Sequence, residues 1–255
     1  MSSLVISGMG FVGSAVMSAL SHEYSIHISD PKLNDNKVFD FDNARGVILC
    51  LPTPQKDDGS CNLSYIDEVL SECYDNIPIL IKSTMSLDGF RKLREKYSLL
   101  SLTFSPEFLT AKNAKTDFKN QKTMYFAGDK STYWASIFEK AMPNIHTKIY
   151  DSIDTLILAK YFRNSFLALK VSYANQMFDA CEKLHISFDD LIDIFVDDDR
   201  IGNSHTKVPG DDGRGFGGAC FPKDTSALLH TMNRYQIDLS ILNAAVSYNN
   251  KIKEN

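Results

Sequence analysis

The sequence lacks the long apolar run of a membrane-spanning helix. No stretch of its 255 residues approaches the ~18 to 20 apolar residues that are needed to cross a bilayer. The first ten residues, MSSLVISGMG, also lack the basic region and the cleavage site of a secretory signal. We therefore expect a cytoplasmic protein without a membrane partner.

Excess positive charge and paired cysteines are also missing. The formal net charge is −5, so the chain carries no electrostatic footprint for nucleic acid. Its five cysteines are widely spaced and form no CxxC pair, which argues against a disulfide framework and against a zinc site. The six histidines show no paired spacing. We expect reduced thiols, no bound metal and no nucleic-acid partner.

The first part of the sequence alternates short apolar runs with helix-like segments. This alternation predicts a parallel sheet covered by helices, and the lack of tight hairpin signals favours crossover connections. The predicted strands are 4–7, 25–29, 46–51, 79–83, 100–104, 124–127 and 145–149. The predicted helices are 12–21, 65–74, 87–97 and 132–141. We assign residues 1–150 to a Rossmann-like, doubly wound α/β domain.

The pattern changes after residue 150. From 153 to about 184 the chain has no proline or glycine, and its apolar residues recur at helical spacing, which predicts one long helix. Shorter helices are expected at 188–196, 225–234 and 239–253, with a glycine-rich loop at 202–218. Residues 151–255 thus form a predicted all-helical domain, whose long helix suits a scaffold or a dimer interface.

A glycine-rich turn joins the first predicted strand to the first predicted helix. Gly8, Gly10 and Gly13 have GxGxxG spacing, in which the first glycine makes the turn and the second lets a pyrophosphate approach the backbone. The third lets helix and strand pack closely, and the helix N-terminus attracts phosphate. Asp30 ends the second strand, where a carboxylate binds ribose hydroxyls and repels a 2′-phosphate. We expect NAD rather than NADP; a tight turn without a ligand is the alternative.

Six motifs connect the chain to a known family. In order they are LPTP (51–54), IKST (81–84), FSPEFL (104–109), AKYFRNSFLALKVSYANQ (159–176), DDRIG (198–202) and GFGGACFPKD (215–224). Together they resemble the UDP-glucose 6-dehydrogenase branch of the nucleotide-sugar dehydrogenases (UDP-glucose/GDP-mannose dehydrogenase family). The resemblance runs over nearly the whole chain. It implies the oxidation of a sugar CH₂OH to a carboxylate in two hydride transfers that consume two NAD.

The cysteine of GFGGACFPKD has a chemical role in such a reaction. A hydride cannot easily leave an aldehyde, whereas thiolate addition gives a thiohemiacetal that can deliver the second hydride and leave a thioester. Cys220 matches the family nucleophile, and positive charge from Lys223 and the loop N–H groups would raise its thiolate fraction. The alternative is a small buried filler, which is the interpretation that we give to the other four cysteines.

Four further residues complete the predicted catalytic set. Lys160 and Asn164 are four apart and share one helix face, where a cation and an amide can stabilise an oxyanion. The resemblance implies that Asp224 helps to hold the lysine and a water. It also implies that Glu107 contacts substrate and activates the water that cleaves the thioester, a task that suits a carboxylate with a raised pKa. A solvated helix face and a surface acid are the respective alternatives.

The resemblance also implies the binding contacts. Those to NAD are Gly8, Gly10, Phe11, Val12, Gly13, Asp30, Thr53, Thr84 and Lys223. Those to the nucleotide sugar are Glu107, Phe108, Leu109, Lys160, Asn164, Arg200 and Gly217. Arg200 matches an arginine that reaches substrate across a dimer interface, and its alternative is an ion pair within its own DDDR cluster. We expect a homodimer through the long helix.

Three features depart from the family pattern. Ala111 stands where the family has a second glutamate, so one cofactor or substrate contact is expected to be missing. Only about fifteen residues separate Asp30 from the next strand, so a strand and a helix on the adenosine side are expected to be absent. The sequence ends at Asn255, before the second Rossmann-like domain that supplies much of the UDP pocket in the family. It is either a compact form that closes its site with a partner subunit or a fragment.

Three functions fit these observations. The leading hypothesis is an NAD-dependent dehydrogenase that converts UDP-glucose to UDP-glucuronate. The second keeps this chemistry with GDP-mannose or a UDP-N-acetylhexosamine. The third is a catalytically silent NAD-binding dimer that has lost its sugar pocket.

Overall fold

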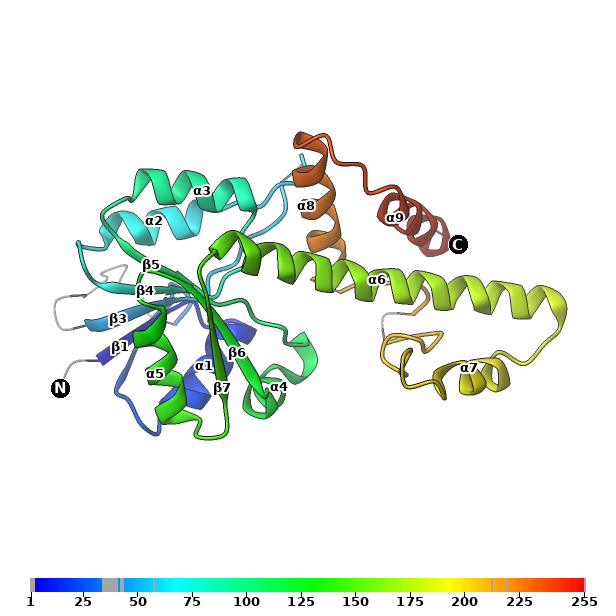
Figure 1. The fold of residues 1–255 in the computed structure, drawn as a ribbon, viewed down its shortest axis with the longest axis horizontal. Helices are drawn as coiled ribbons and strands as arrows, with labels where there is room; N and C mark the ends of the chain where they lie inside the picture. The colour runs from blue at the N-terminus through cyan, green and yellow to red at the C-terminus, as the bar shows by residue number, and fades with distance from the viewer. Residues whose placement is uncertain are drawn as a thin grey trace. The chain divides into compact units, whose positions relative to one another are not determined.

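The computed structural model describes residues 3–33, 41, 44–56, 58–211, 213–218 and 220–254, with the side chain of Ala111 left out. The chain divides into two compact units. The first consists of Met1–Lys56 and Cys61–Lys160, and the second of Asp57–Ser60 and Tyr161–Asn255. The first unit holds the sheet, and the second consists of helices and loops (Figure 1). The predictions about the segment that follows Asp30 and about the Ala111 side chain lie outside the described part.

Seven strands of the described chain form one sheet in the first unit. Their order is β2-β1-β3-β4-β5-β6-β7 (Figure 1). The pairs among β1 to β5 are parallel, so the carboxyl ends of these five strands meet at one edge. The strands are β1 Ser3–Ser7, β2 Ile26–Ser29, β3 Ala44–Leu49, β4 Pro78–Ile81, β5 Ser101–Phe104, β6 Thr123–Gly128 and β7 His146–Tyr150. The predicted fold class is confirmed.

One strand pair departs from the parallel expectation. Strand β6 is antiparallel to β5, with Phe104 opposite Ala127 and Thr103 opposite Gly128, and β7 is parallel to β6. Strand β6 therefore starts beyond the carboxyl end of β5 and runs back along it. The connection between them, which contains α4, therefore does not have to cross back to the other end of the sheet. Alternating apolar residues do not encode strand direction, so the sequence pattern could not show this reversal.

Helices cover the sheet of the first unit. They are α1 Phe11–Leu20, α2 Ser64–Glu72, α3 Leu87–Lys96, α4 Ala114–Asn120 and α5 Ser131–Ala141, with a short 3₁₀ helix η1 Ala111–Asn113 before α4. The sequence did not predict α4, because only Ala114 and Phe118 of this helix are buried and two positions give no visible apolar period. Phe118 packs with Phe138, Phe126 and the fully buried Trp134 in the core on one face of the sheet.

Four helices form the second unit's framework. They are α6 Ile153–Leu184, which begins in the first unit, α7 Phe188–Val196, α8 Phe221–Arg234 and α9 Ser240–Lys253. The long helix has the predicted bounds. The start predicted for α8 was wrong by four residues, because Pro222 in the first turn favours a helix start there. None of the described helices is long and apolar enough to span a membrane.

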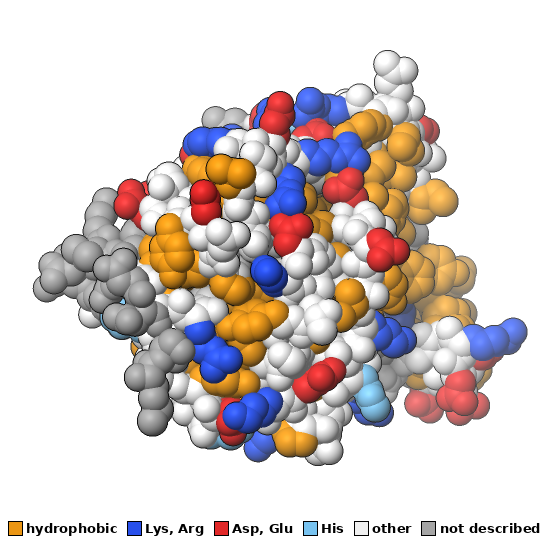
Figure 2. Space-filling view, turned by 60° about the vertical axis from the view of Figure 1, so that its left-hand side comes forward, with side chains coloured by type: hydrophobic (Ala, Val, Ile, Leu, Met, Phe, Trp, Pro, Cys, Tyr) orange, Lys and Arg blue, Asp and Glu red, His pale blue; other side chains and the backbone are white. Residues whose placement is uncertain are grey.

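Charge is spread over the face drawn in Figure 2. Basic and acidic side chains are interspersed there, and apolar side chains gather along the right-hand side of the view. Since neither positive nor negative side chains form a continuous patch, the electrostatics of this face do not favour binding of a polyanion.

The third glycine of the GxGxxG turn gives a stability prediction. A Cβ at Gly13 would lie 1.9 Å from the Gly8 carbonyl oxygen, whereas a Cβ at Gly10 would meet no atom within 4 Å. We expect Gly13→Ala to lower the free energy of unfolding by about 2 kcal/mol or more in a denaturant titration. The matched variant Gly10→Ala, which meets no atom but replaces glycine at the N-cap of α1, should cost about 1 kcal/mol or less. Equal stability of the two variants would contradict the close approach of α1 to the turn after β1.

Candidate active site

The glycine turn lies at the carboxyl end of β1. Gly8 has a φ of +91°, and a Cβ there would lie 2.7 Å from the Cys50 carbonyl oxygen, so a side chain is excluded. Gly10 is the N-cap of α1 and has no side-chain hydrogen bond at this cap. The space beside Gly10 is open, which leaves the first N–H groups of α1 accessible to a phosphate. The turn therefore fits a dinucleotide.

Asp30 closes this region after β2. Its Oδ2 accepts a hydrogen bond from the Met9 N–H at 2.7 Å, and its Oδ1 accepts one from the Lys32 N–H at 2.9 Å. These bonds fix the carboxylate beside the glycine turn. Each oxygen keeps a lone pair that can accept a bond from a ribose hydroxyl.

A hollow of about 500 Å³ opens at the start of α1. Gly10 and Phe11 line one side, and Lys112 and Lys115 line the other. The described residues that line it include no acid. Two cations beside free helix N–H groups suit the phosphates of a nucleotide.

A buried ion pair lies after β5. The Lys160 Nζ is 2.5 Å from Glu107 Oε1 and donates to the Glu107 carbonyl oxygen at 2.8 Å. Burial alone would raise the pKa of Glu107, but the Lys160 charge and hydrogen bond, the Leu109 N–H and the Lys82 charge together hold it below its ordinary value. The expectation of a raised pKa was therefore wrong, since the sequence does not show that Lys160 pairs with this carboxylate.

The candidate nucleophile starts a helix in the second unit. Cys220 is the partly exposed N-cap of α8, where the helix dipole favours a thiolate. Asp224 lies one turn on and is fully buried. Its Oδ2 accepts a bond from Asn164 Nδ2 at 2.6 Å, while Lys223 Nζ lies 2.9 Å from Oδ1 as an ion pair outside hydrogen-bond geometry. The second unit thus holds a thiol and a buried carboxylate within one turn of α8, and an amide of α6 that binds the carboxylate.

Two asparagines that the sequence analysis did not single out fix the loop before Cys220. Asn175 Oδ1 accepts a bond from the Gly215 N–H at 3.1 Å. Asn249 Oδ1 accepts one from the Phe216 N–H at 2.6 Å, and Asn249 Nδ2 donates to the Phe216 carbonyl oxygen at 3.2 Å. Both asparagines are buried. The signal in the sequence that could have indicated them is an asparagine on the buried face of a predicted helix. These bonds hold the loop against α6 and α9.

The other predicted contacts lie at the start of α1 and on loops in both units. Thr53 is buried after β3, and Thr84 is partly buried after β4, at the same sheet edge as Glu107. Phe108 packs edge-on against Tyr125, and the exposed Arg200 forms an ion pair with Asp198, the alternative named for it. Phe11 is exposed, and Val12, Leu109 and Gly217 are partly buried.

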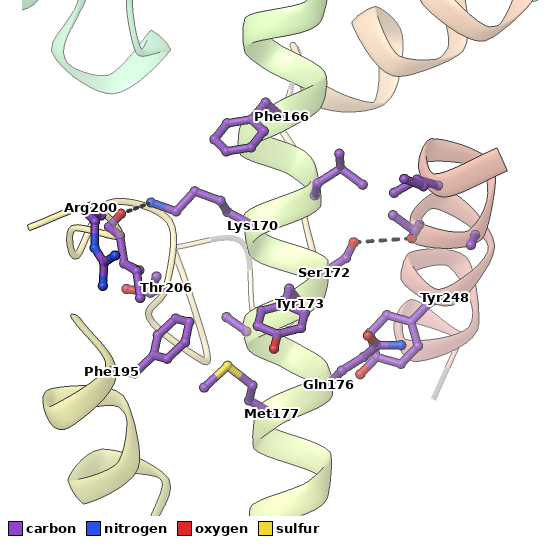
Figure 3. Close-up of a pocket in the computed structure, with 16 residues that line it drawn as sticks. Phe166, Lys170, Ser172, Tyr173, Gln176, Met177, Phe195, Arg200, Thr206 and Tyr248 are labelled. Carbon is purple, nitrogen blue, oxygen red and sulfur yellow. Dashed lines mark hydrogen bonds between the residues drawn. The ribbon is translucent and has the colours of Figure 1, made fainter. Parts of the chain in front are cut away.

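An apolar groove of about 640 Å³ runs between α6, α7 and α9 (Figure 3). Phe166 and Tyr173 of α6 and Ile241 of α9 line it and are 62%, 57% and 75% exposed. Lys170 donates a hydrogen bond to the Ile201 carbonyl oxygen at the rim (Figure 3). A groove of this kind leaves apolar side chains of α6 and α9 in contact with solvent.

Comparisons with known proteins agree with this arrangement. Residues 156–251 match the central domain of the UDP-glucose/GDP-mannose dehydrogenase family. The UDP-glucose 6-dehydrogenase of Rickettsia typhi is 31% identical over 225 residues, which are 82% of this chain and 50% of that protein. The chain therefore spans about half the length of the curated relatives that it matches.

Solved structures share the fold. A UDP-glucose dehydrogenase from Pyrobaculum islandicum superposes with a TM-score of 0.83 at 21% identity, over 98% of this chain and 68% of that one. The UDP-D-ManNAc dehydrogenase of Pyrococcus horikoshii gives 0.78 at 18% identity, over 97% and 68%.

The Asn249 bonds predict the behaviour of the cysteine loop. Asn249→Ala leaves the buried Phe216 N–H without its partner, which should cost about 1–3 kcal/mol locally. We expect faster hydrogen exchange at Phe216 and faster labelling of Cys220 by a thiol reagent. The exposed neighbour Asn250→Ala should change neither rate. Unchanged exchange in Asn249→Ala would show that other contacts hold the loop.

Proposed function

The chain belongs to the UDP-glucose/GDP-mannose dehydrogenase family, and we propose that it oxidises the CH₂OH of a nucleotide sugar to a carboxylate with Cys220 as nucleophile. UDP-glucose, which gives UDP-glucuronate, is the proposed substrate. The observation that carries the proposal is the Cys220 thiol at the start of α8, with the buried Asp224 one turn away and bound to Asn164.

The residues have complementary roles in the proposed reaction. NAD, held by the glycine turn and Asp30, would supply the hydride acceptor for the two oxidations. Between them, the Cys220 thiolate adds to the aldehyde carbon and forms a thiohemiacetal, whose oxyanion the Lys160 ammonium and the Asn164 amide stabilise. Loss of the second hydride converts this adduct into a thioester. Glu107, which its lowered pKa keeps ionised, accepts a proton from the water that cleaves the thioester.

Asp30 supports the choice of NAD. Its carboxylate is fixed by two backbone N–H groups and bears a negative charge where the adenosine ribose is expected. A 2′-phosphate at that ribose would meet this charge. The proposed cofactor is therefore NAD, with its pyrophosphate at the start of α1.

The groove of the second unit supports a homodimer built on α6. Exposed apolar side chains on one side of a long helix favour a partner that buries them. Arg200 lines the same groove, where the proposed dimer would bring it to the partner's substrate.

The nucleophile predicts the outcome of an activity assay. The purified chain with UDP-glucose should form two NADH per sugar, and Cys220→Ala should lower kcat by about 10³-fold or more, because the second oxidation loses its covalent adduct. Cys73→Ala, which removes a thiol at the end of α2, is the control. Undiminished turnover in Cys220→Ala would refute the mechanism.

The same assay compares cofactors and substrates. NADP should support slower turnover than NAD, and faster turnover with NADP would overturn the role of Asp30. Oxidation of GDP-mannose or a UDP-N-acetylhexosamine instead of UDP-glucose would keep the chemistry and change the substrate. NAD binding without turnover of any of them would favour the silent dimer.

The dimer proposal predicts a change of mass. Phe166→Glu places a charge in the apolar groove and should convert a dimer to a monomer in analytical ultracentrifugation. Ile237→Glu, at an exposed apolar position outside the groove, should leave the dimer intact. A parent chain that is monomeric at micromolar concentration would contradict the proposal.

A further inference from the structure

Lys82 is a buried lysine that the proposed mechanism does not use. It follows β4 directly and is 1% exposed. Its Nζ donates to the carbonyl oxygen and to the Oγ of Ser105, both at 3.1 Å. The rings of Phe118 and Phe138 lie 5.8 and 6.0 Å from this nitrogen. Within the described part of the chain, no carboxylate lies within ion-pair distance of it.

Burying this ammonium group is costly. Burial lowers the pKa of Lys82 to about 8, although the Glu107 charge acts in the opposite direction and the Lys160 charge acts with burial. Burial also raises the pKa of Cys50 to about 12, so this thiol stays neutral. An unbranched apolar side chain would fill the same space without this cost. A lysine here is therefore explained better by what its charge does than by packing.

Two lysines hold the turn that carries Glu107. Lys82 binds Ser105 at the beginning of the turn, and Lys160 binds the carbonyl oxygen and the carboxylate of Glu107 at its end. Ser105 also extends the sheet, because its N–H donates to the Ile81 carbonyl oxygen at 3.0 Å. The turn is thus fixed between β4 and α6.

We propose that Lys82 is a positioning residue for the reaction proposed above: through Ser105 it fixes the turn that aims Glu107, and its charge helps Lys160 to keep that carboxylate ionised. The inference rests on the proposed function where it assigns Glu107 as the base. The electrostatic link between Lys82 and Glu107 exists in the resting protein and can be measured without turnover.

The activity test replaces Lys82 by methionine, which has a similar length and no charge. We expect kcat at pH 7 to fall about tenfold through misplacement of Glu107, with the KM for NAD within about twofold of the parent. The acid limb of the kcat profile should move to higher pH, because Glu107 loses a favourable charge. Ser105→Ala should lower kcat without moving the acid limb, and Lys92→Met, which removes an exposed cation from α3, should change neither.

Carbon-13 NMR of the Glu107 carboxyl group provides the readout that does not need activity. The pKa of Glu107 should be higher in Lys82→Met than in the parent. If this variant does not fold, the parent alone decides, because the Glu107 resonance should show a second inflection near pH 8, where Lys82 loses its proton.

An unchanged Glu107 pKa, or no inflection near pH 8, would overturn the proposal, as would an acid limb that does not move in an active Lys82→Met. A shifted Glu107 pKa in a parent chain without dehydrogenase activity would support the link from Lys82 to Glu107 and refute the proposed function instead.

Discussion

The buried ion pair between Glu107 and Lys160 is the interaction on which the candidate site of the first unit depends. It joins the turn after β5 to the beginning of α6. Removal of one partner would leave the other as an uncompensated buried charge, which typically costs about 3–5 kcal/mol. The pair therefore constrains both segments. Helix α6 continues without interruption to Asn164, which binds Asp224 in the first turn of α8. Helix α6 thus carries both Lys160, which pairs with Glu107, and Asn164, which binds Asp224.

The sequence predicted most of the fold because its elements carry regular patterns. The apolar period of α6 and the strand-like run before the glycine turn are local, so their bounds were close to those observed. Helix α4 and the reversal of β6 were not predictable in this way. The first buries only two side chains, and the second depends on where a connection lies rather than on the residues of the strand.

The candidate site was predictable to a smaller extent. Motif resemblance indicated Cys220, Lys160 and Glu107 as residue types, but their ionisation depends on partners that are distant in sequence. Lys160 lies 53 residues from Glu107, and Asn249 lies 33 residues from Phe216. No spacing rule connects such pairs. For the same reason Lys82 stood within the IKST motif without a role until its contact with Ser105 was visible.

The Asn249 side chain gives Phe216 both an acceptor and a donor, as a neighbouring strand would. One side chain of α9 thereby pairs with both backbone groups of a loop residue, as a residue of a neighbouring strand does in a sheet. Because the Asn249 side chain binds only backbone atoms of Phe216, these two hydrogen bonds do not depend on the side chain at position 216. Aspartate in place of Asn249, although nearly the same size, would keep the acceptor and lose the donor, and so would keep only half of the pairing.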